Sequence, residues 1–281
     1  MKDIELWQGD CLQLMSNIPD GLVDMIFTDL PYNTTQNSWD CMINLDELWK
    51  QYKRIIKKNG CIALWAQAPF SHVLAMSNLR QYKYEWIIEK TKATGHLNAK
   101  KMPMKAHENI MIFADLDDTP ETLQVFYEKL PTYNPQMTEG HTPVHSYTKH
   151  SSDGGCYGKT QIGWSGGGST QRYPRDVLQF KWDTQKSSLH PTQKPLEACE
   201  YFIKTYTNPG DLVLDSCMGS NTTGLACKNL GRKFIGIEKE EQYFEIAKNR
   251  IQDVVFEQFD AYYILIKNGN KNPILFSKGD K

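Results

Sequence analysis

Short apolar runs alternate along the chain with stretches of helical periodicity. The runs at 23–28 and 61–65 are almost continuously apolar, which is typical of strands buried on both faces of a sheet. Asn59 and Gly60 are predicted to stop one helix, and Pro69 to open the next. Strands that alternate with helices predict an α/β fold with a doubly wound, mostly parallel sheet. Strands are predicted at 4–9, 23–28, 61–65, 84–89, 109–114, 211–215 and 233–237, and helices at 11–17, 45–58, 196–207, 222–230 and 241–255.

The periodicity fades between residues 115 and 189. Gly, Ser, Thr, His, Tyr and Trp dominate there, as in Trp164–Ser169. An unstructured loop of this length is uncommon inside a compact core, so we predict an inserted module outside the main core. The predicted organisation is one half at 1–114, the insertion at 115–189, a second half at 190–266 and a peripheral tail at 267–281.

Composition narrows the class of protein. The chain has 281 residues, of which 40% are hydrophobic and 23% charged, so disordered and fibrous classes are excluded. No apolar run reaches the length of a membrane-spanning helix, and the first residues lack a signal-peptide core. The seven cysteines form no Cys-x-x-Cys pair and the histidine spacings match no metal-ligand pattern. We therefore expect a cytoplasmic protein with reduced thiols and no metal.

Charge is balanced overall but not locally. The net charge is −1, so any contact with nucleic acid must come from a local patch. Between Arg80 and Asn109 seven cations stand against three acids, which fits a strip that contacts phosphates, although a solvated face is the simpler explanation. Candidate DNA-binding residues are Lys90, Lys92, Lys100 and Lys101 in this strip, and Arg172 and Arg175 in the insertion.

A chemical signal follows the run at 211–215. Asp215 ends the predicted strand, small residues follow, and a helix is predicted from Thr222. Small residues let a ligand approach the backbone, and a helix N-terminus favours an anionic or polar group. The next predicted strand ends in Glu238, and an acidic residue there is the usual partner of a ribose diol. Neither the dinucleotide nor the P-loop glycine pattern is present, so a phosphate cradle is not predicted.

Three motifs resemble those of the β group of amino-group DNA methyltransferases. Asp211–Gly224 is similar to the first motif of the family, His190–Pro195 to its H-x-T-x-K-P segment, and Asp29–Tyr32 to its catalytic D-P-P-Y. The catalytic tetrapeptide comes first in the chain, as in a circular permutation of the common methyltransferase fold. The resemblance implies a permuted, Rossmann-like fold that binds S-adenosylmethionine, with the catalytic half first, target recognition in the insertion, and the cofactor half last.

The resemblance also implies a set of cofactor contacts. Each of these residues lies at the carboxyl end of a predicted strand, or in a segment that follows or precedes a predicted helix. They are Asp215, Gly219 and Ser220 for the methionine end, Thr192, Lys194 and Thr222 for its carboxylate, Glu238 for the ribose hydroxyls, and Asp10 with the backbone N–H of Cys11 for the adenine.

The tetrapeptide Asp29-Leu30-Pro31-Tyr32 suits amine methylation. An exocyclic amine is a poor nucleophile because its lone pair is delocalised into the ring. The Asp29 carboxylate and the Leu30 carbonyl would accept its two hydrogens and favour a tetrahedral nitrogen that attacks the methyl group directly. A base inside a duplex must be flipped out to reach them, and Tyr32 would stack on it.

The chain departs from the family pattern at two places. Leu30 stands where the family has proline, which removes a fixed backbone angle. Ser216-Cys217 replaces Pro-Phe, and Asn221 stands in the Ser-Gly-Thr step, where asparagine tolerates a left-handed conformation. We expect these changes to affect loop rigidity and cofactor affinity.

These observations predict a site-specific DNA methyltransferase that acts on adenine N6, because Asp rather than Ser at position 29 resembles the N6 type. The alternatives are an N4-cytosine methyltransferase and a non-catalytic DNA-binding protein on the same scaffold. The predicted partner is double-stranded DNA. The resemblance also raises a homodimer, a cognate restriction endonuclease, and a nucleoid-associated location in a bacterial or phage setting.

Overall fold

The computed structural model describes residues 3–32, 41–114, 130–148, 165–181 and 193–251. Its helices are α1 (Cys11–Leu14), α2 (Leu45–Ile55), α3 (Phe70–Ser77), α4 (Leu196–Tyr206), α5 (Thr222–Leu230) and α6 (Glu241–Arg250), with 3-10 turns η1 (Met15–Asn17) and η2 (His96–Asn98). Its strands are β1 (Ile4–Gln8), β2 (Val23–Asp29), β3 (Ile56–Ala66), β4 (Tyr82–Thr94), β5 (Lys105–Phe113), β6 (Tyr147–Thr148), β7 (Ser165–Gly166), β8 (Val177–Phe180), β9 (Leu212–Asp215) and β10 (Lys233–Glu238). None of the described helices is long and apolar enough to span a membrane.

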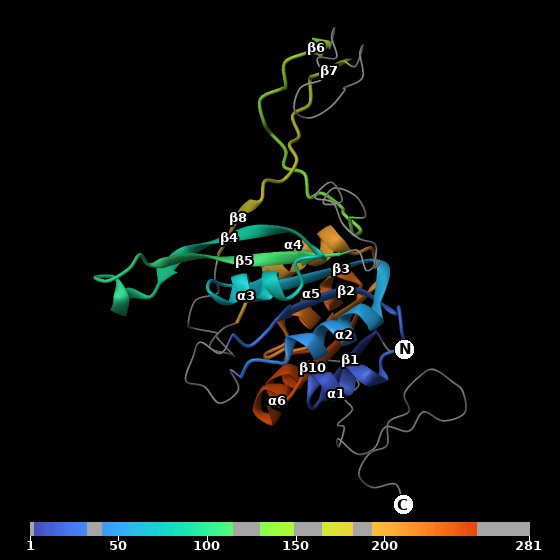
Figure 1. Cartoon of the computed structure of the whole chain (residues 1–281). Helices are drawn as coiled ribbons and strands as arrows, with labels where there is room; N and C mark the ends of the chain where they lie inside the picture. The colour runs from blue at the N-terminus through green and yellow to red at the C-terminus, as the bar shows by residue number, and fades with distance from the viewer. Residues whose placement is uncertain (1–2, 33–40, 115–129, 149–164, 182–192, 252–281) are drawn as a thin grey trace, which may run out of the picture. The chain divides into compact units, whose positions relative to one another are not determined.

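Eight strands form one mostly parallel sheet, in the order β1-β10-β9-β2-β3-β5-β4-β8 (Figure 1). β5 is antiparallel to both of its neighbours, and the other pairs are parallel. This confirms the predicted α/β class. The first two strands lie beside the last two in the sheet, because β1 pairs with β10, and β2 pairs with β9.

Alternate residues of the central strands enter two cores, one on each face of the sheet. In β2, Met25 and Phe27 face the core that holds α4, α5 and α6, whereas Ile26 faces the core that holds α1, α2 and α3. Trp65 and Leu64 of β3 divide in the same way. Helices therefore cover both faces, which explains why these strands are apolar throughout.

The predicted end of the second helix is wrong. The helix α2 ends at Ile55 rather than at Lys58, and β3 begins at Ile56. Ile56 pairs with Val23 of β2, and the Lys57 ammonium lies 2.6 Å from Asp24. Gly60 lies inside the strand, where an added Cβ would come within 2.9 Å of the Asp24 carbonyl oxygen. Pairing with β2 therefore outweighs the local helix-stop signal.

The described chain divides into two compact units. The first contains residues 1–134 and 176–281, and the second contains 135–175, with its own β6–β7 pair and an isolated bridge between Thr138 and Arg172. The β8 strand falls within the predicted insertion, yet it pairs with β4, and Phe180 is buried in the core. The predicted boundaries of the insertion stay a prediction, and the predicted tail lies outside the described residues.

Candidate active site

The carboxyl ends of four parallel strands place acidic residues together. Glu238 at the end of β10 pairs in register with Gln8, the last residue of β1, and Asp10 follows directly. Asp215 ends β9, and Asp29 ends β2, the neighbouring strand. Parallel strands end at the same edge of a sheet, so four acidic side chains from distant segments meet there.

A cavity of about 220 Å³ opens at this edge of the sheet, within the first unit. It brings together the predicted catalytic and cofactor residues apart from Tyr32, which contacts Asp29, and Thr192, which lies outside the described residues. The predicted residues that line it are Asp10, Cys11, Asp29, Leu30, Pro31, Lys194, Asp215, Gly219, Ser220, Thr222 and Glu238.

Asp215 is buried and held by donors from two segments. The Thr28 hydroxyl donates to Asp215 Oδ1 at 2.6 Å, and the Cys217 backbone N–H donates to the same oxygen at 3.1 Å. Burial raises the pKa of Asp215 to about 6, although hydrogen bonds from Thr28 and Thr223 oppose the rise. Thr28 thus ties the end of β2 to the turn after β9.

Glu238 is oriented by backbone donors. The Gly219 N–H donates to Oε2 at 2.9 Å, and the Glu240 N–H donates to Oε1 at 2.8 Å. Burial raises the pKa of Glu238 to about 7, against these two hydrogen bonds. The carboxylate is therefore fixed at the cavity wall, with remaining lone pairs that can accept hydroxyl groups.

The residues that depart from the family pattern are accommodated locally. The Ser216 hydroxyl shares a 2.7 Å hydrogen bond with the buried Tyr52 hydroxyl. Asn221 adopts a left-handed backbone conformation at φ 64°, and its side chain accepts from the Gly224 N–H at the start of α5. The Leu30 side chain is buried in the core that holds α1, α2 and α3, which anchors the segment after β2 where the family pattern has proline.

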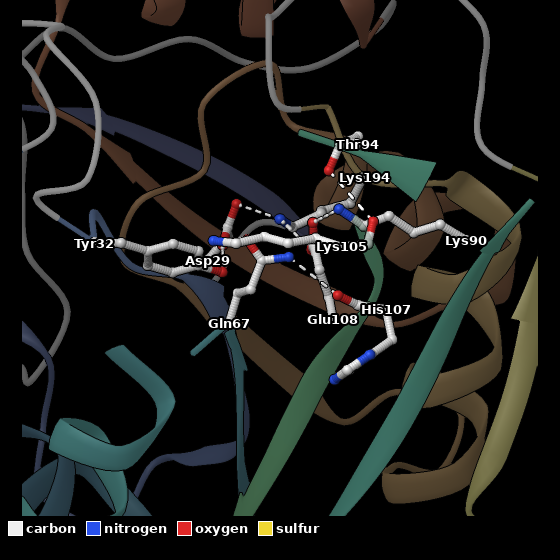
Figure 2. A network of polar contacts seen from close by, with 9 residues as sticks. All are labelled: Asp29, Tyr32, Gln67, Lys90, Thr94, Lys105, His107, Glu108 and Lys194. Carbon is white, nitrogen blue, oxygen red and sulfur yellow. Dashed lines mark hydrogen bonds and ion pairs between the residues drawn. The ribbon is translucent and has the colours of Figure 1, made fainter. Parts of the chain in front are cut away.

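Asp29 is held between a phenol and an ammonium group. The Tyr32 hydroxyl donates to Asp29 Oδ1 at 2.6 Å, and Lys194 Nζ lies 2.9 Å from Oδ2 (Figure 2). The Tyr32 ring stacks on Phe70, with centroids 4.9 Å apart. The Lys194 ammonium also lies 5.1 Å from the centre of the Trp65 ring.

Four charged groups alternate in sign along one row, which we name the charge row: Asp29, Lys194, Glu108 and Lys90. Lys194 Nζ lies 2.9 Å from Glu108 Oε2, and Lys90 Nζ lies 2.6 Å from Glu108 Oε1 (Figure 2). The side chains of Lys194, Glu108 and Lys90 are only 10% to 11% exposed. The row carries no net charge, so its members can remain ionised at this depth.

The pKa values follow from this arrangement. Burial raises the pKa of Asp29, and Lys194 opposes the rise while Glu108 adds to it. Burial would lower the pKa of Lys194, but Asp29 and Glu108 outweigh burial and raise it. Burial would raise the pKa of Glu108, but Lys194 and Lys90 hold it below its usual value. The ammonium of Lys194 thus stabilises a charged Asp29.

The predicted DNA-contacting residues occupy different surroundings. Lys90 belongs to the charge row, whereas Lys92, Lys100 and Lys101 are exposed beyond it, where β4 and β5 project. In the second unit, the Arg172 guanidinium donates to the carbonyl groups of Thr142, Ser169 and Gln171, and Arg175 is exposed.

Sequence reasoning missed several residues that support the site. Glu108, Thr28 and Arg250 lie in different elements, and none has a motif of its own. Arg250 donates to the Ser220 carbonyl and to the Thr222 hydroxyl, so it fixes the turn before α5. A charged residue directly before the mostly apolar run at 109–113 was the signal that could have indicated Glu108.

The lining of the cavity favours a cationic ligand. It contains five carboxyl groups and two lysines, and small residues lie at the turn around Gly219. Glu238 suits a ribose diol, and Asp29 presents an acceptor for an amine hydrogen. Among the residues that the structure describes, no group of acidic, histidine or cysteine side chains could hold a metal ion.

Comparison with known proteins agrees with this geometry. A family model for DNA methylases matches residues 23–249. The type II methyltransferase M.HinfI of Haemophilus influenzae is 26% identical over 275 residues, covering 88% of this chain and 68% of its own. The type II methyltransferase M2.MboI of Moraxella bovis is 24% identical, covering 90% of this chain and 89% of its own.

Solved structures show the same fold. The crystal structure of an M1.HpyAVI–SAM complex matches with a TM-score of 0.58 and 26% identity, covering 88% of this chain and all of the other. The cytosine-N4-specific PvuII DNA methyltransferase matches with a TM-score of 0.61 at 15% identity, covering 91% of this chain and 89% of the other.

Asp215→Asn should stabilise the ligand-free protein above neutral pH. The folded pKa of about 6 exceeds the usual 3.8, so the ionised carboxylate lowers the free energy of unfolding as the pH rises through this window. We expect the variant to be more stable by about 1 to 3 kcal/mol at pH 8, a gain that shrinks toward pH 4. Urea unfolding of wild type and variant at pH 8 and pH 4 measures this difference in stability. A variant less stable than wild type at pH 8 would contradict the prediction.

Proposed function

The chain belongs to the DNA methylase family, and we propose that it transfers a methyl group to the N6 amine of adenine at a specific site in duplex DNA. Membership makes it a DNA methyltransferase that uses S-adenosylmethionine. The observation that carries the proposal is the Asp29 carboxylate, which ends β2 at the cavity wall and is held by Tyr32 and Lys194.

The cavity residues fit S-adenosylmethionine. The acidic lining suits its sulfonium and ammonium charges, and the fixed Glu238 carboxylate suits its ribose hydroxyls. Asp215, Gly219 and Ser220 would hold the methionine end, Asp10 the adenine. When bound, the cofactor supplies an electrophilic methyl group, so the reaction needs no metal.

The catalytic loop would orient the amine. Asp29 accepts one hydrogen and the Leu30 carbonyl the other, which directs the nitrogen lone pair toward the methyl group. Lys194 keeps Asp29 ionised and therefore an acceptor. Tyr32 would stack on the extruded base, with Phe70 supporting one face of its ring.

The choice of adenine rests on Asp29, because aspartate rather than serine at this position resembles the N6 type. The same geometry would serve cytosine N4, which is the second candidate. The proposal includes target recognition by the segment at 115–189. It also includes a homodimer, a cognate restriction endonuclease, and a cytoplasmic location beside bacterial or phage DNA.

Incubation with labelled S-adenosylmethionine and unmethylated duplex DNA of mixed sequence tests the reaction. Digestion to nucleosides should yield labelled N6-methyladenine, and sequencing of the methylated DNA should give the site.

We expect Asp29→Ala to lower the rate of methyl transfer by about 10² to 10³-fold, because the main acceptor for the amine is lost. Calorimetry should show unchanged cofactor affinity. Asp46→Ala, at an exposed position of α2, is the control.

Each outcome has a definite meaning. Labelled N4-methylcytosine would overturn the choice of base and keep the mechanism. A fully active Asp29→Ala protein would overturn the mechanism. Cofactor binding without any label would favour a DNA-binding protein that lacks the chemistry.

Two variants of the charge row should move the acidic limb of the pH–rate profile in opposite directions. Lys194→Met removes the cation that lowers the pKa of Asp29, so the limb should move up by about one pH unit or more. Glu108→Gln removes a like charge that raises this pKa, so the limb should move down. Lys53→Met, exposed on α2, should leave the profile unchanged. Unmoved limbs in both variants would show that the row does not control Asp29.

A further inference from the structure

The strands β4 and β5 continue past the edge of the sheet as a hairpin arm, which we define as residues 91–107 (Figure 1). Every residue of the arm is exposed. Gly95, with φ at 89°, allows the tight turn that leads into η2. The arm buries nothing of its own, so packing of the core does not explain its sequence.

All the formally charged side chains of the arm are positive. The arm contains Lys92, Lys100, Lys101 and Lys105 and no acidic residue, in a chain whose net charge is −1. Concentrated positive charge on an exposed projection suits a polyanion, and phosphates of DNA are the polyanion that the proposed function supplies.

Exposed apolar side chains lie at and near the tip of the arm. Leu97 in η2 is 88% exposed, the largest exposure among the large hydrophobic side chains that the structure describes, and Met102 and Met104 are also exposed. A leucine in water on a lysine-rich arm gains free energy only when another surface covers it. Apolar side chains flanked by cations are the means by which proteins insert between base pairs and unstack them.

The root of the arm is fixed to the active site. Lys105 Nζ donates to Gln67 Oε1 at 3.2 Å, and Gln67 Nε2 donates to the His107 carbonyl at 3.0 Å (Figure 2). The next residue is Glu108 of the charge row, which reaches Asp29 through Lys194. The arm therefore projects from a position set by the catalytic loop.

The reach of the arm follows from strand geometry. Glu89 pairs with His107 at the root, and Thr94 lies five residues further along β4. In β5 only the two residues from His107 to Lys105 span the same interval, so the Thr94–Lys105 pair lies about 7 Å beyond the root at about 3.3 Å per residue, and η2 with Leu97 lies further out.

We propose that the hairpin arm binds the duplex beside the target base, with its lysines on phosphates and Leu97 inserted as a wedge between neighbouring base pairs. This rests on the proposed function. A wedge there would bend the duplex at a second place and help the target nucleotide to leave the stack.

The test uses duplexes that contain the site found by sequencing, with 2-aminopurine placed in turn at the target and at each neighbouring position. Wild-type protein should increase fluorescence at the target and at a second, neighbouring position. Leu97→Ala should lose the second increase and lower DNA affinity about tenfold or more, because burial of a leucine is lost, while calorimetry shows unchanged cofactor affinity. Met76→Ala, an equally apolar and 71% exposed residue of α3, is the control.

The lysines have a separate readout. Lys92→Gln, Lys100→Gln and Lys101→Gln should each reduce the slope of log affinity against log salt by about 0.9, because each releases one counterion fewer. Leu97→Ala should leave this slope unchanged. The difference in salt dependence between the Leu97 variant and the lysine variants distinguishes insertion of the leucine from contact of the lysines with phosphates.

Several results would overturn the proposed role of the arm. These are a fluorescence profile in Leu97→Ala that matches wild type, an unchanged salt slope in the lysine variants, or binding of the arm to phosphatidylserine vesicles with no effect on DNA. If the wild-type protein methylates DNA but these variants behave as Met76→Ala does, the proposed role of the arm is rejected and the proposed function is kept. Wild-type protein that neither binds nor methylates duplex DNA would reject the proposed function, and the arm with it.

Discussion

A buried carboxylate at the wall of the cavity stays ionised only with a cationic partner, and this constraint organises the site. Burial alone raises the pKa of Asp29 and favours the neutral form, which could not accept from an amine with the same strength. The Lys194 ammonium at 2.9 Å offsets the effect, and its own burial is offset by Glu108, which Lys90 neutralises in turn. A charge is tolerated here because each member has a partner of opposite sign.

The charge row also explains how distant segments are joined. Asp29 ends β2, Glu108 lies in β5, and Lys194 immediately precedes the helix-opening Pro195. The Thr28 hydroxyl donates to Asp215 at the end of β9, so the end of β2 contacts residues of the C-terminal half through both Thr28 and Asp29. These contacts fix the end of β2 against both halves of the sheet, and β5 continues from Glu108 into the hairpin arm. The charge row and the hydrogen bond between Thr28 and Asp215 thus join the segments that line the cavity.

Local sequence patterns predicted where these strands end, but they did not predict which residues from other elements contact the strand ends. Acidic residues that directly follow apolar runs predicted strand ends at Asp29, Asp215 and Glu238, and β2, β9 and β10 end at these residues. The helix α5 begins at Thr222 as predicted. The junction at Ile55 was missed because pairing of β3 with β2 is not visible in a local pattern. The pairing of Lys194 and Lys90 with Glu108 was missed for the same reason, since Lys194 lies 86 positions and Lys90 lies 18 positions from Glu108 in the chain.

The most direct test of this account is the protonation state of Asp29 itself, measured by ¹³C NMR of its carboxyl carbon in the wild-type protein through a pH titration. Asp29→Asn identifies the resonance. The account predicts a carboxyl that is ionised at pH 7.5, with a midpoint above the ordinary 3.8. A carboxyl that is still protonated at pH 7.5 would contradict it, because Lys194 would then fail to hold the acceptor in its charged form.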